Sequence, residues 1–417
     1  MTLSAFDIAA ILVVLVAAFG YINHRLLKLP QSIAMTGMGA VMSLLVVLFD
    51  RLNPGAGLSA HAAAFLGGVD FETTLLDGML SFLLFAGALH VDWHELRRGR
   101  WPILVLSTVG VLLSTALVGG GFYLLTQWLG VPLPLIWCLV FGALISPTDP
   151  VAVMAVLRRT ETSPTLQATV AGESLFNDGV GVVIFSILLT AAASGADFAI
   201  PHFLQAFVVE AGGGVLLGLL VGSIGFFAMR SIDEYNVELM ITLAVVMGGY
   251  TLGHWIGVSG PVAMAVAGLL IGNAGVALAM SDVTRDHVLK FWALVDELLN
   301  AILFLLIGLE IIAISPSPTL LLLGALAIPL LLVARWVSVA TPLAVIRSLP
   351  ERPARVTLVW GGLRGGISVA LALSLTHQPA REAILTVTYL VVLFSVLVQG
   401  ATIGPLLKRV EGERQGE

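Results

Sequence analysis

The sequence predicts an all-α integral membrane protein, a single unit of thirteen transmembrane helices over residues 1–417. Of its residues 58% are hydrophobic and 11% are charged, which is about half the charged share of a soluble domain. Apolar runs follow one another with short connections, and the basic residues gather in alternate connections. These three observations indicate a chain that crosses the membrane repeatedly, with no soluble domain visible.

Each apolar run is long enough for a transmembrane helix, which needs about 20 residues. The runs lie at residues 5–23, 32–49, 73–91, 102–127, 132–157, 166–193, 203–229, 235–254, 260–280, 287–313, 317–346, 355–376 and 382–409. The first run contains Asp7 and is followed, not preceded, by the basic residues Arg25 and Lys28. A secretory signal has the opposite charge order, so we expect this run to be retained as the first helix.

The basic residues predict the orientation, because lysine and arginine concentrate in cytoplasmic loops. Of the 20 basic residues, Arg335 and Arg364 lie inside expected helices, and Arg51 and Arg381 lie in connections on one side. All the others fall in the alternate connections. We therefore expect a protein of the cell membrane, plasma or inner, with its N-terminus outside and its C-terminus in the cytoplasm.

Composition excludes several other classes of function. The net charge of -6 offers no basic surface for nucleic acid. The single Cys138 excludes an internal disulfide. No Gly-x-x-x-x-Gly-Lys phosphate loop occurs, so nucleotide chemistry has no support, and we expect no cofactor.

Two expected spans, 132–157 and 355–376, are interrupted in the middle. Ser-Pro-Thr-Asp-Pro at 146–150 contains two prolines, which remove backbone donors and disfavour helix at the preceding residues. Gly-Gly-Leu-Arg-Gly-Gly at 361–366 places four glycines around Arg364. These spans are the fifth and the twelfth, so they run in opposite directions, as an inverted repeat of helices 1–6 and 8–13 requires. Non-helical backbone at this depth has to line a cavity or be buried in protein.

The sixth span carries a polar cluster near its middle: Glu173, Ser174, Asn177 and Asp178. Helical spacing stacks Ser174 on Asp178 and Glu173 on Asn177. A carboxylate at a helix centre costs roughly 2.5 to 3.5 kcal/mol to insert into a membrane, so a chain that keeps two of them is expected to use them. A proton and a hard cation such as sodium or lithium compete for the same oxygens.

Three further polar residues each have two interpretations, and a fourth lies near the edge of the membrane. Asp296 and Asn300 share a face of the tenth span, where they either line a cytoplasmic funnel or pack against neighbouring helices. His254, at the outer end of the eighth span, is either a pH sensor or an interfacial hydrogen-bonding residue. Glu310 lies near the outer end of the tenth span, where we expect it to be hydrated.

Three motifs, in this order and spacing, resemble the NhaP type of monovalent cation/proton antiporters, relatives of the animal sodium/proton exchangers. They are Ser-Pro-Thr-Asp-Pro at 146–150, Gly-Glu-Ser-Leu-Phe-Asn-Asp at 172–178 and Gly-Gly-Leu-Arg-Gly at 361–365. The resemblance covers essentially the whole chain. It implies a homodimeric transporter of the lipid bilayer, not an enzyme, that exchanges Na⁺, Li⁺ or K⁺ for protons in pH homeostasis.

The resemblance also implies roles for individual residues. Asp178 is the carboxylate that binds cation and proton in turn, and Thr148, Asp149 and Ser174 help to hold the ion. Asn177 beside Asp178 implies electroneutral one-for-one exchange, since relatives with Asp-Asp at this position tend to be electrogenic.

Two further implications concern the surroundings of the ion. Glu173 would form a structural ion pair with an arginine in the membrane, and both Arg335 and Arg364 fit the family pattern. Some relatives carry a glutamate near the ion in the third span, whereas this sequence has Ala86 there. The segment around Ala86, residues 85–90, therefore offers no acid as a ligand here.

The expected fold divides into two parts. Helices 4–6 and 11–13, residues 101–196 and 317–410, form a mobile core bundle. Helices 1–3 and 8–10, residues 5–92 and 234–313, form a scaffold, and residues 203–229 bridge the two parts. The resemblance makes the scaffold the homodimer interface.

Two other classes of function are less well supported. An intramembrane hydrolase has no Gly-x-Ser-x-Gly elbow here, and His94-Glu95 is not followed by the second histidine of the zinc motif. A cation channel would use the same carboxylates in a continuous pore. Opposed, interrupted helices around a single buried acidic site favour an antiporter over both.

Overall fold

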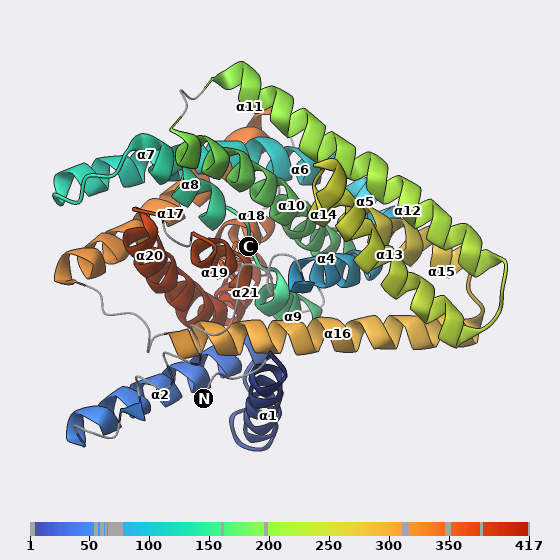
Figure 1. Ribbon diagram of the computed structural model, residues 1–417, viewed down its shortest axis with the longest axis horizontal. Helices are drawn as coiled ribbons and strands as arrows, with labels where there is room; N and C mark the ends of the chain where they lie inside the picture. Colours follow the sequence, from blue (N-terminus) through green and yellow to red (C-terminus); the bar gives the residue numbers. More distant parts are fainter. Residues whose placement is uncertain are drawn as a thin grey trace.

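The computed structural model describes most of the chain as one helical body (Figure 1). The described residues are 5–53, 57, 58, 62, 65, 78–159, 162–195, 199–310, 317–346, 352–375 and 378–415. Every regular element in these ranges is a helix. The structure thus has the all-helical fold that the sequence predicts.

Ten helical segments of the described chain are long and apolar enough to cross a membrane. They are built from α1 (Ala5–Ile22), α2 (Gln31–Leu52), α6 and α7 (Arg100–Val105, Val111–Trp128), α10 (Pro164–Ser194), α11 and α12 (Ile200–Phe207, Gly213–Arg230), α13 (Tyr235–Ile256), α14 and α15 (Gly260–Leu270, Val276–Leu278), α16 (Asp282–Leu309), α17 (Pro318–Val345), and α20 and α21 (Arg381–Phe394, Gly400–Gln415). The shorter helices are α4 (Leu80–Leu89), α5 (Trp93–Arg98), α8 (Leu135–Ile145), α9 (Val151–Arg159), α18 (Arg352–Trp360) and α19 (Gly366–Leu373).

The ten long segments coincide with ten of the predicted spans. The third predicted span is represented by α4, because residues 66–77 lie outside the described residues. The fifth and twelfth spans are each split into two short helices, α8 with α9 and α18 with α19. The breaks that the prolines and glycines predict in these two spans are therefore confirmed.

Serine caps determine where several helices begin. Ser163 Oγ accepts a hydrogen bond from the backbone nitrogen of Leu166 (3.3 Å) at the start of α10. Ser281 Oγ does the same for Thr284 (3.4 Å). Such caps satisfy backbone donors that have no partner inside the helix. As a result α16 starts at Asp282, five residues before the predicted boundary at 287.

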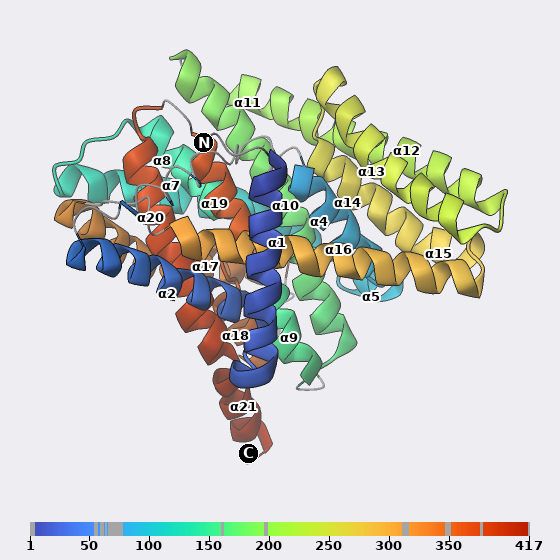
Figure 2. The same cartoon turned by 60° about the horizontal axis from the view of Figure 1, so that its bottom comes forward.

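α16 runs across the molecule with α2 beside it, as Figures 1 and 2 both show. A Cβ atom on Gly308 of α16 would lie 2.5 Å from the Thr36 carbonyl oxygen and 2.7 Å from the Ala40 nitrogen of α2. Glycine is therefore needed for the two backbones to approach this closely. Ser43 adds a hydrogen bond from its hydroxyl to the Gly308 carbonyl oxygen (3.0 Å).

α10 lies between two groups of helices (Figure 1). In one group α7 packs against α8 and α17, and α17 packs against α20. In the other group α14 packs against α4, α12 and α13. α10 contacts both α8 and α14, so its central polar residues lie where the two groups meet.

The two interrupted spans meet at their breaks. The backbone nitrogen of Asp149 donates to the carbonyl oxygen of Leu363 (2.8 Å), which makes an antiparallel bridge between two non-helical segments. This bridge joins the segment at 146–150 to the segment at 361–365. The crossing therefore brings residues more than 200 positions apart in the chain next to the middle of α10.

Candidate functional site

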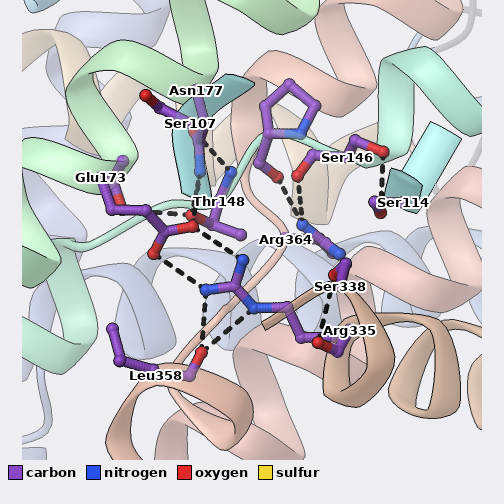
Figure 3. Close-up of polar contacts among 12 residues, drawn as sticks. Ser107, Ser114, Ser146, Thr148, Glu173, Asn177, Arg335, Ser338, Leu358 and Arg364 are labelled. Carbon is purple, nitrogen blue, oxygen red and sulfur yellow. Dashed lines mark hydrogen bonds and ion pairs between the residues drawn. The ribbon is translucent and has the colours of Figure 1, made fainter. Parts of the chain in front are cut away.

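The polar residues predicted for the site gather where the two broken spans cross beside α10. α10 supplies Glu173, Ser174, Asn177 and Asp178, the α8–α9 segment supplies Thr148 and Asp149, α17 supplies Arg335, and the α18–α19 segment supplies Arg364. Figure 3 shows Thr148, Glu173, Asn177 and Arg335 joined by a chain of polar contacts.

Asn177 and Thr148 hold the unwound α8–α9 segment against α10 (Figure 3). The fully buried Asn177 side chain donates from its amide nitrogen to Thr148 Oγ1 (2.7 Å). Its amide oxygen accepts from the Thr148 backbone nitrogen (3.2 Å). Thr148 Oγ1 also lies 3.1 Å from Ser174 Oγ. The Asn177 side chain thus supplies the hydrogen-bond acceptor that the Thr148 backbone nitrogen lacks where the helix is broken.

Glu173 and Arg335 form a buried bidentate ion pair. Two guanidinium nitrogens of Arg335 donate to the two Glu173 oxygens at 2.7 and 2.9 Å. The guanidinium also donates to the Leu358 carbonyl oxygen (2.8 and 3.1 Å), and the Asn177 amide reaches Glu173 Oε1 (3.2 Å). Paired charges with additional hydrogen bonds are the arrangement in which burial is tolerated. Of the two arginines that the sequence offers, the structure places Arg335 opposite Glu173.

Arg364 has different partners. Its guanidinium donates to the carbonyl oxygens of Ser146 (2.5 Å) and Pro147 (3.0 Å). Its backbone nitrogen donates to Ser395 Oγ (2.8 Å). Among the described residues, no carboxylate lies within ion-pair distance of Arg364. Arg364 therefore satisfies carbonyl groups that lose their helical partners where α8 ends, and it brings a positive charge to the crossing.

Asp178 faces a cavity of about 140 Å³, large enough for several water molecules. Its side chain is only 7% exposed, and it makes no hydrogen bond or ion pair with the described residues. Asp149 and Thr148 line the same cavity. Asp178 is thus a buried carboxylate whose oxygens are available to a ligand inside the cavity.

Asp296 and Asn300 of α16 also line this cavity. The Asn300 amide donates to Asp296 Oδ1 (3.0 Å). Of the two interpretations that their spacing allows, the structure therefore supports the cavity wall. The cavity extends along α10 from Asp178 towards Ala171, in the direction of the N-terminal end of that helix.

Gly365 is required beside Asp149. The Asp149 Oδ1 atom accepts from the backbone nitrogen of Val151 (2.8 Å), which fixes the carboxylate at the start of α9. A Cβ atom on Gly365 would collide with that carboxylate. The glycines of the α18–α19 segment therefore leave room for an acidic side chain from the crossing segment.

From the described part of the third span, residues 78–91, only apolar residues and a glycine line the cavity. Ala86 is fully buried in a hydrophobic cluster with residues of α12, α13, α14 and α16, and it does not line the cavity. Gly87 lines the cavity instead, and a Cβ atom there would meet no other atom within 4 Å. Leu83, Leu84 and Gly87 are therefore the residues through which α4 faces the cavity.

Several features of the site are not predicted by the sequence. The Leu358 carbonyl that binds Arg335 is a backbone group, which no residue pattern reveals. Ser395 and Gln399, hydrogen-bonded to each other at 2.8 Å, support Arg364 from a π-helical turn before α21. Their spacing of four residues in an otherwise apolar span was the available signal. The expectation that Glu310 is hydrated is wrong: only 5% of the residue is exposed, because the end of α16 is buried.

Comparison with known proteins gives one consistent result. Residues 12–409 match the sequence profile of the family described as sodium/hydrogen exchanger, transmembrane. The chain is 45% identical over 412 residues to the Na(+)/H(+) antiporter NhaP of Pseudomonas aeruginosa, covering 97% of this chain and 96% of that protein. It is 33% identical over 394 residues to the Na(+)/H(+) antiporter NhaH of Halobacillus aidingensis, covering 93% of each.

The fold agrees with this result. The structure of the sodium proton antiporter MjNhaP1 from Methanocaldococcus jannaschii superimposes with a TM-score of 0.76 over 97% of both chains, at 23% sequence identity. Similarity at that level of identity shows a shared fold, while the profile and the relatives above show shared descent. The chain therefore belongs to the sodium/hydrogen exchanger family of transmembrane proteins.

Proposed function

We propose that this exchanger moves a sodium ion in one direction and a proton in the other, with Asp178 binding the two in turn. The environment of Asp178 carries the proposal, because its buried carboxylate faces a cavity without a hydrogen-bond partner among the described residues. Buried polar groups are normally paired. An unpaired carboxylate beside a cavity is suited to a ligand that comes and goes.

The neighbouring oxygens suit a hard monovalent cation. Thr148 and Ser174 present hydroxyl oxygens 3.1 Å apart, and Asp149 presents a second carboxylate at the same cavity. Carboxylate and hydroxyl oxygens are the ligands that hard cations prefer. We assign Asp178, Asp149, Thr148 and Ser174 as the cation-binding residues. Lithium suits the same ligands, and potassium is a further candidate.

We propose a stoichiometry of one cation for one proton. Asn177 is an amide and does not titrate, and its side chain is committed to Thr148 and Glu173. Both Glu173 oxygens are bound by Arg335. Asp178 is then the carboxylate of α10 that is free to exchange ligands, so each half of the cycle carries one positive charge.

The alternating-access cycle would use two parts of the molecule. Residues 101–196 and 317–410 form the mobile core, residues 5–92 and 234–313 form the scaffold, and 203–229 bridge them. The cavity supports this division, because α10 and α19 line it from the core while α4 and α16 line it from the scaffold. We further propose a homodimer paired through the scaffold, in the cell membrane, with the N-terminus outside.

The test is dissipation of a pH gradient in proteoliposomes on addition of Na⁺, Li⁺ or K⁺ in turn. Wild-type protein should give saturable, cation-dependent proton movement. Asp178→Asn keeps the size of the side chain and should abolish that movement, whereas Asp286→Asn makes the same change at an exposed position and should not. Exchange that survives in Asp178→Asn would refute the assignment, and flux that never saturates would indicate a channel.

A further inference from the structure

A second cavity, of about 260 Å³, lies on the far side of Asp178 along the same helices. On α10 the first cavity is lined by residues up to Asp178, and the second by residues from Val182 to Leu189. A helix rises about 1.5 Å per residue, so Ser186 in the second cavity lies about 12 Å beyond Asp178 along α10. The two cavities therefore lie towards opposite ends of α10 from Asp178.

The other walls follow the same order. α19 contributes residues 366–368 to the first cavity and then Leu371 and Ser374 to the second. From α4, Leu83, Leu84 and Gly87 line the first cavity and Leu80 lines the second. Core helices α10 and α19 thus line both spaces on one side, and scaffold helix α4 lines both on the other.

Apolar side chains separate the two cavities. Leu84 and Ile367 line the first cavity, and Leu80 and Val182 line the second. All four belong to one hydrophobic cluster. In this conformation Asp178 opens into the first cavity, while packed hydrocarbon closes it off from the second.

The second cavity holds a carboxylate that the ion site does not use. Glu210 lies in the π-helical turn Val208–Gly212 between α11 and α12, and its carbonyl oxygen accepts from the Ser259 backbone nitrogen (3.0 Å). The half-buried Glu210 carboxylate makes no hydrogen bond or ion pair with the described residues. Tyr250 and His254 line the same cavity.

We propose that this second cavity is the approach site for the cation on the outer face, and that the Glu210 carboxylate concentrates monovalent cations there before the interface opens to Asp178. The inference rests on the proposed function, since an outer approach site has a role only if Asp178 is reached from both faces. A carboxylate in a cavity with apolar walls raises the local concentration of cations. Glu210 is then a positioning residue, distinct from the cation ligands at the crossing.

The experiment compares the two faces of the membrane. Cation-dependent proton movement is measured in right-side-out and in everted vesicles as a function of sodium concentration on the exposed face. Glu210→Gln should raise the half-saturating sodium concentration at the outer face about three- to tenfold, since the attracting charge is lost, and leave it unchanged at the cytoplasmic face. Glu382→Gln removes an exposed carboxylate at the start of α20 that lines neither cavity, so it should stay near the wild-type value.

A chemical variant keeps the test decisive if Glu210→Gln is poorly produced. Cys138 is fully buried and is the only cysteine of the chain, so Glu210→Cys offers a single reactive thiol. A membrane-impermeant sulfonate reagent added outside should restore tight outer-face affinity, and a trimethylammonium reagent should weaken it further. Equal effects of the two reagents would refute a role for charge at position 210.

The two proposals fail in different ways. If wild-type protein shows no exchange, or Asp178→Asn retains it, the proposed function is wrong. If those two proteins behave as expected but Glu210→Gln alters neither face, or alters both faces equally, the outer approach site is wrong.

Discussion

Two carboxylates five positions apart on α10 have opposite surroundings. Both oxygens of Glu173 are bound by Arg335, and the residue is 2% exposed. Asp178 is 7% exposed, faces a cavity and has no such partner among the described residues. A bound guanidinium holds Glu173 in place, whereas we propose that the unpaired Asp178 carboxylate binds a mobile ion. On this proposal, the presence or absence of an ion-pair partner, and not the residue type, distinguishes the structural carboxylate from the ion-binding one.

Removing one partner of the Glu173–Arg335 pair should destabilise the protein strongly. Glu173→Gln or Arg335→Gln leaves a buried charge unpaired, which costs about 3 to 5 kcal/mol in comparable pairs. The double variant removes both charges, so its loss should be well below the sum of the single losses. Thermal unfolding of the purified wild-type, single-variant and double-variant proteins in detergent measures this double-mutant cycle. Arg364→Gln is the control, since its combination with Glu173→Gln should show no such recovery.

The sequence alone does not determine whether Arg335 or Arg364 pairs with Glu173. Arg335 and Arg364 both fall in the middle of apolar spans, and either could face an acid on α10. Arg364 is instead occupied by the carbonyl oxygens of Ser146 and Pro147. Those acceptors exist only because the chain is unwound there, and they belong to the backbone. If the losses of stability in Glu173→Gln and Arg335→Gln simply add up in the double variant, the pair carries no coupling energy.

At the scale of elements, the crossing of the two interrupted spans depends on local rules that the sequence displays. Proline excludes regular helix at 146–150, and glycines leave space at 361–366. Both breaks were predictable for this reason. The supports from neighbouring helices were not: Ser395 on the last span binds the Arg364 backbone nitrogen through a contact 31 residues away. Such contacts require knowledge of which helices are adjacent.

Gly365→Ala should disable exchange without unfolding the protein. Gly365 has φ -125°, which alanine adopts freely, so the effect comes from space alone. The new methyl group would displace the Asp149 carboxylate, and misplacement of a functional group by about 1 Å can reduce a rate roughly 10²-fold. Proton movement in proteoliposomes measures the loss. Gly120→Ala in α7 is the matched control, because the added methyl group would meet no atom within 4 Å and Gly120 does not line the cavity. Equal activity of both variants would contradict the role assigned to Asp149.

At the scale of the whole molecule, hydropathy and charge predicted most of the architecture. Ten long apolar segments and the two broken spans lie where the apolar runs predict them. The cavities were not predictable, because each combines short pieces of several helices. Position 87 illustrates this limit of the sequence. Ala86 packs in a hydrophobic cluster, whereas the next residue of α4, Gly87, lines the cavity.

One-for-one exchange predicts that turnover is indifferent to membrane potential. Each half-cycle carries a single positive charge, so no net charge crosses the membrane. An electrogenic cycle would gain or lose about 2.3 kcal/mol per charge for each 100 mV, which is easily seen as a change in rate. Proteoliposomes with the potential set by valinomycin and potassium provide the measurement, with sodium as the transported ion. Clear acceleration or slowing would mean that a second proton moves and that Asn177 does not set the stoichiometry.

The central claim is that cation and proton compete for the Asp178 carboxylate, and proton release tests it most directly. Purified protein in weakly buffered detergent solution receives sodium, and the protons released are counted by a pH indicator while bound sodium is measured in parallel. Wild-type protein should release one proton for each sodium ion bound, with apparent sodium affinity falling as the pH is lowered. Asp178→Asn should release none. Sodium binding without proton release by the wild-type protein, or unchanged release by Asp178→Asn, would contradict the account.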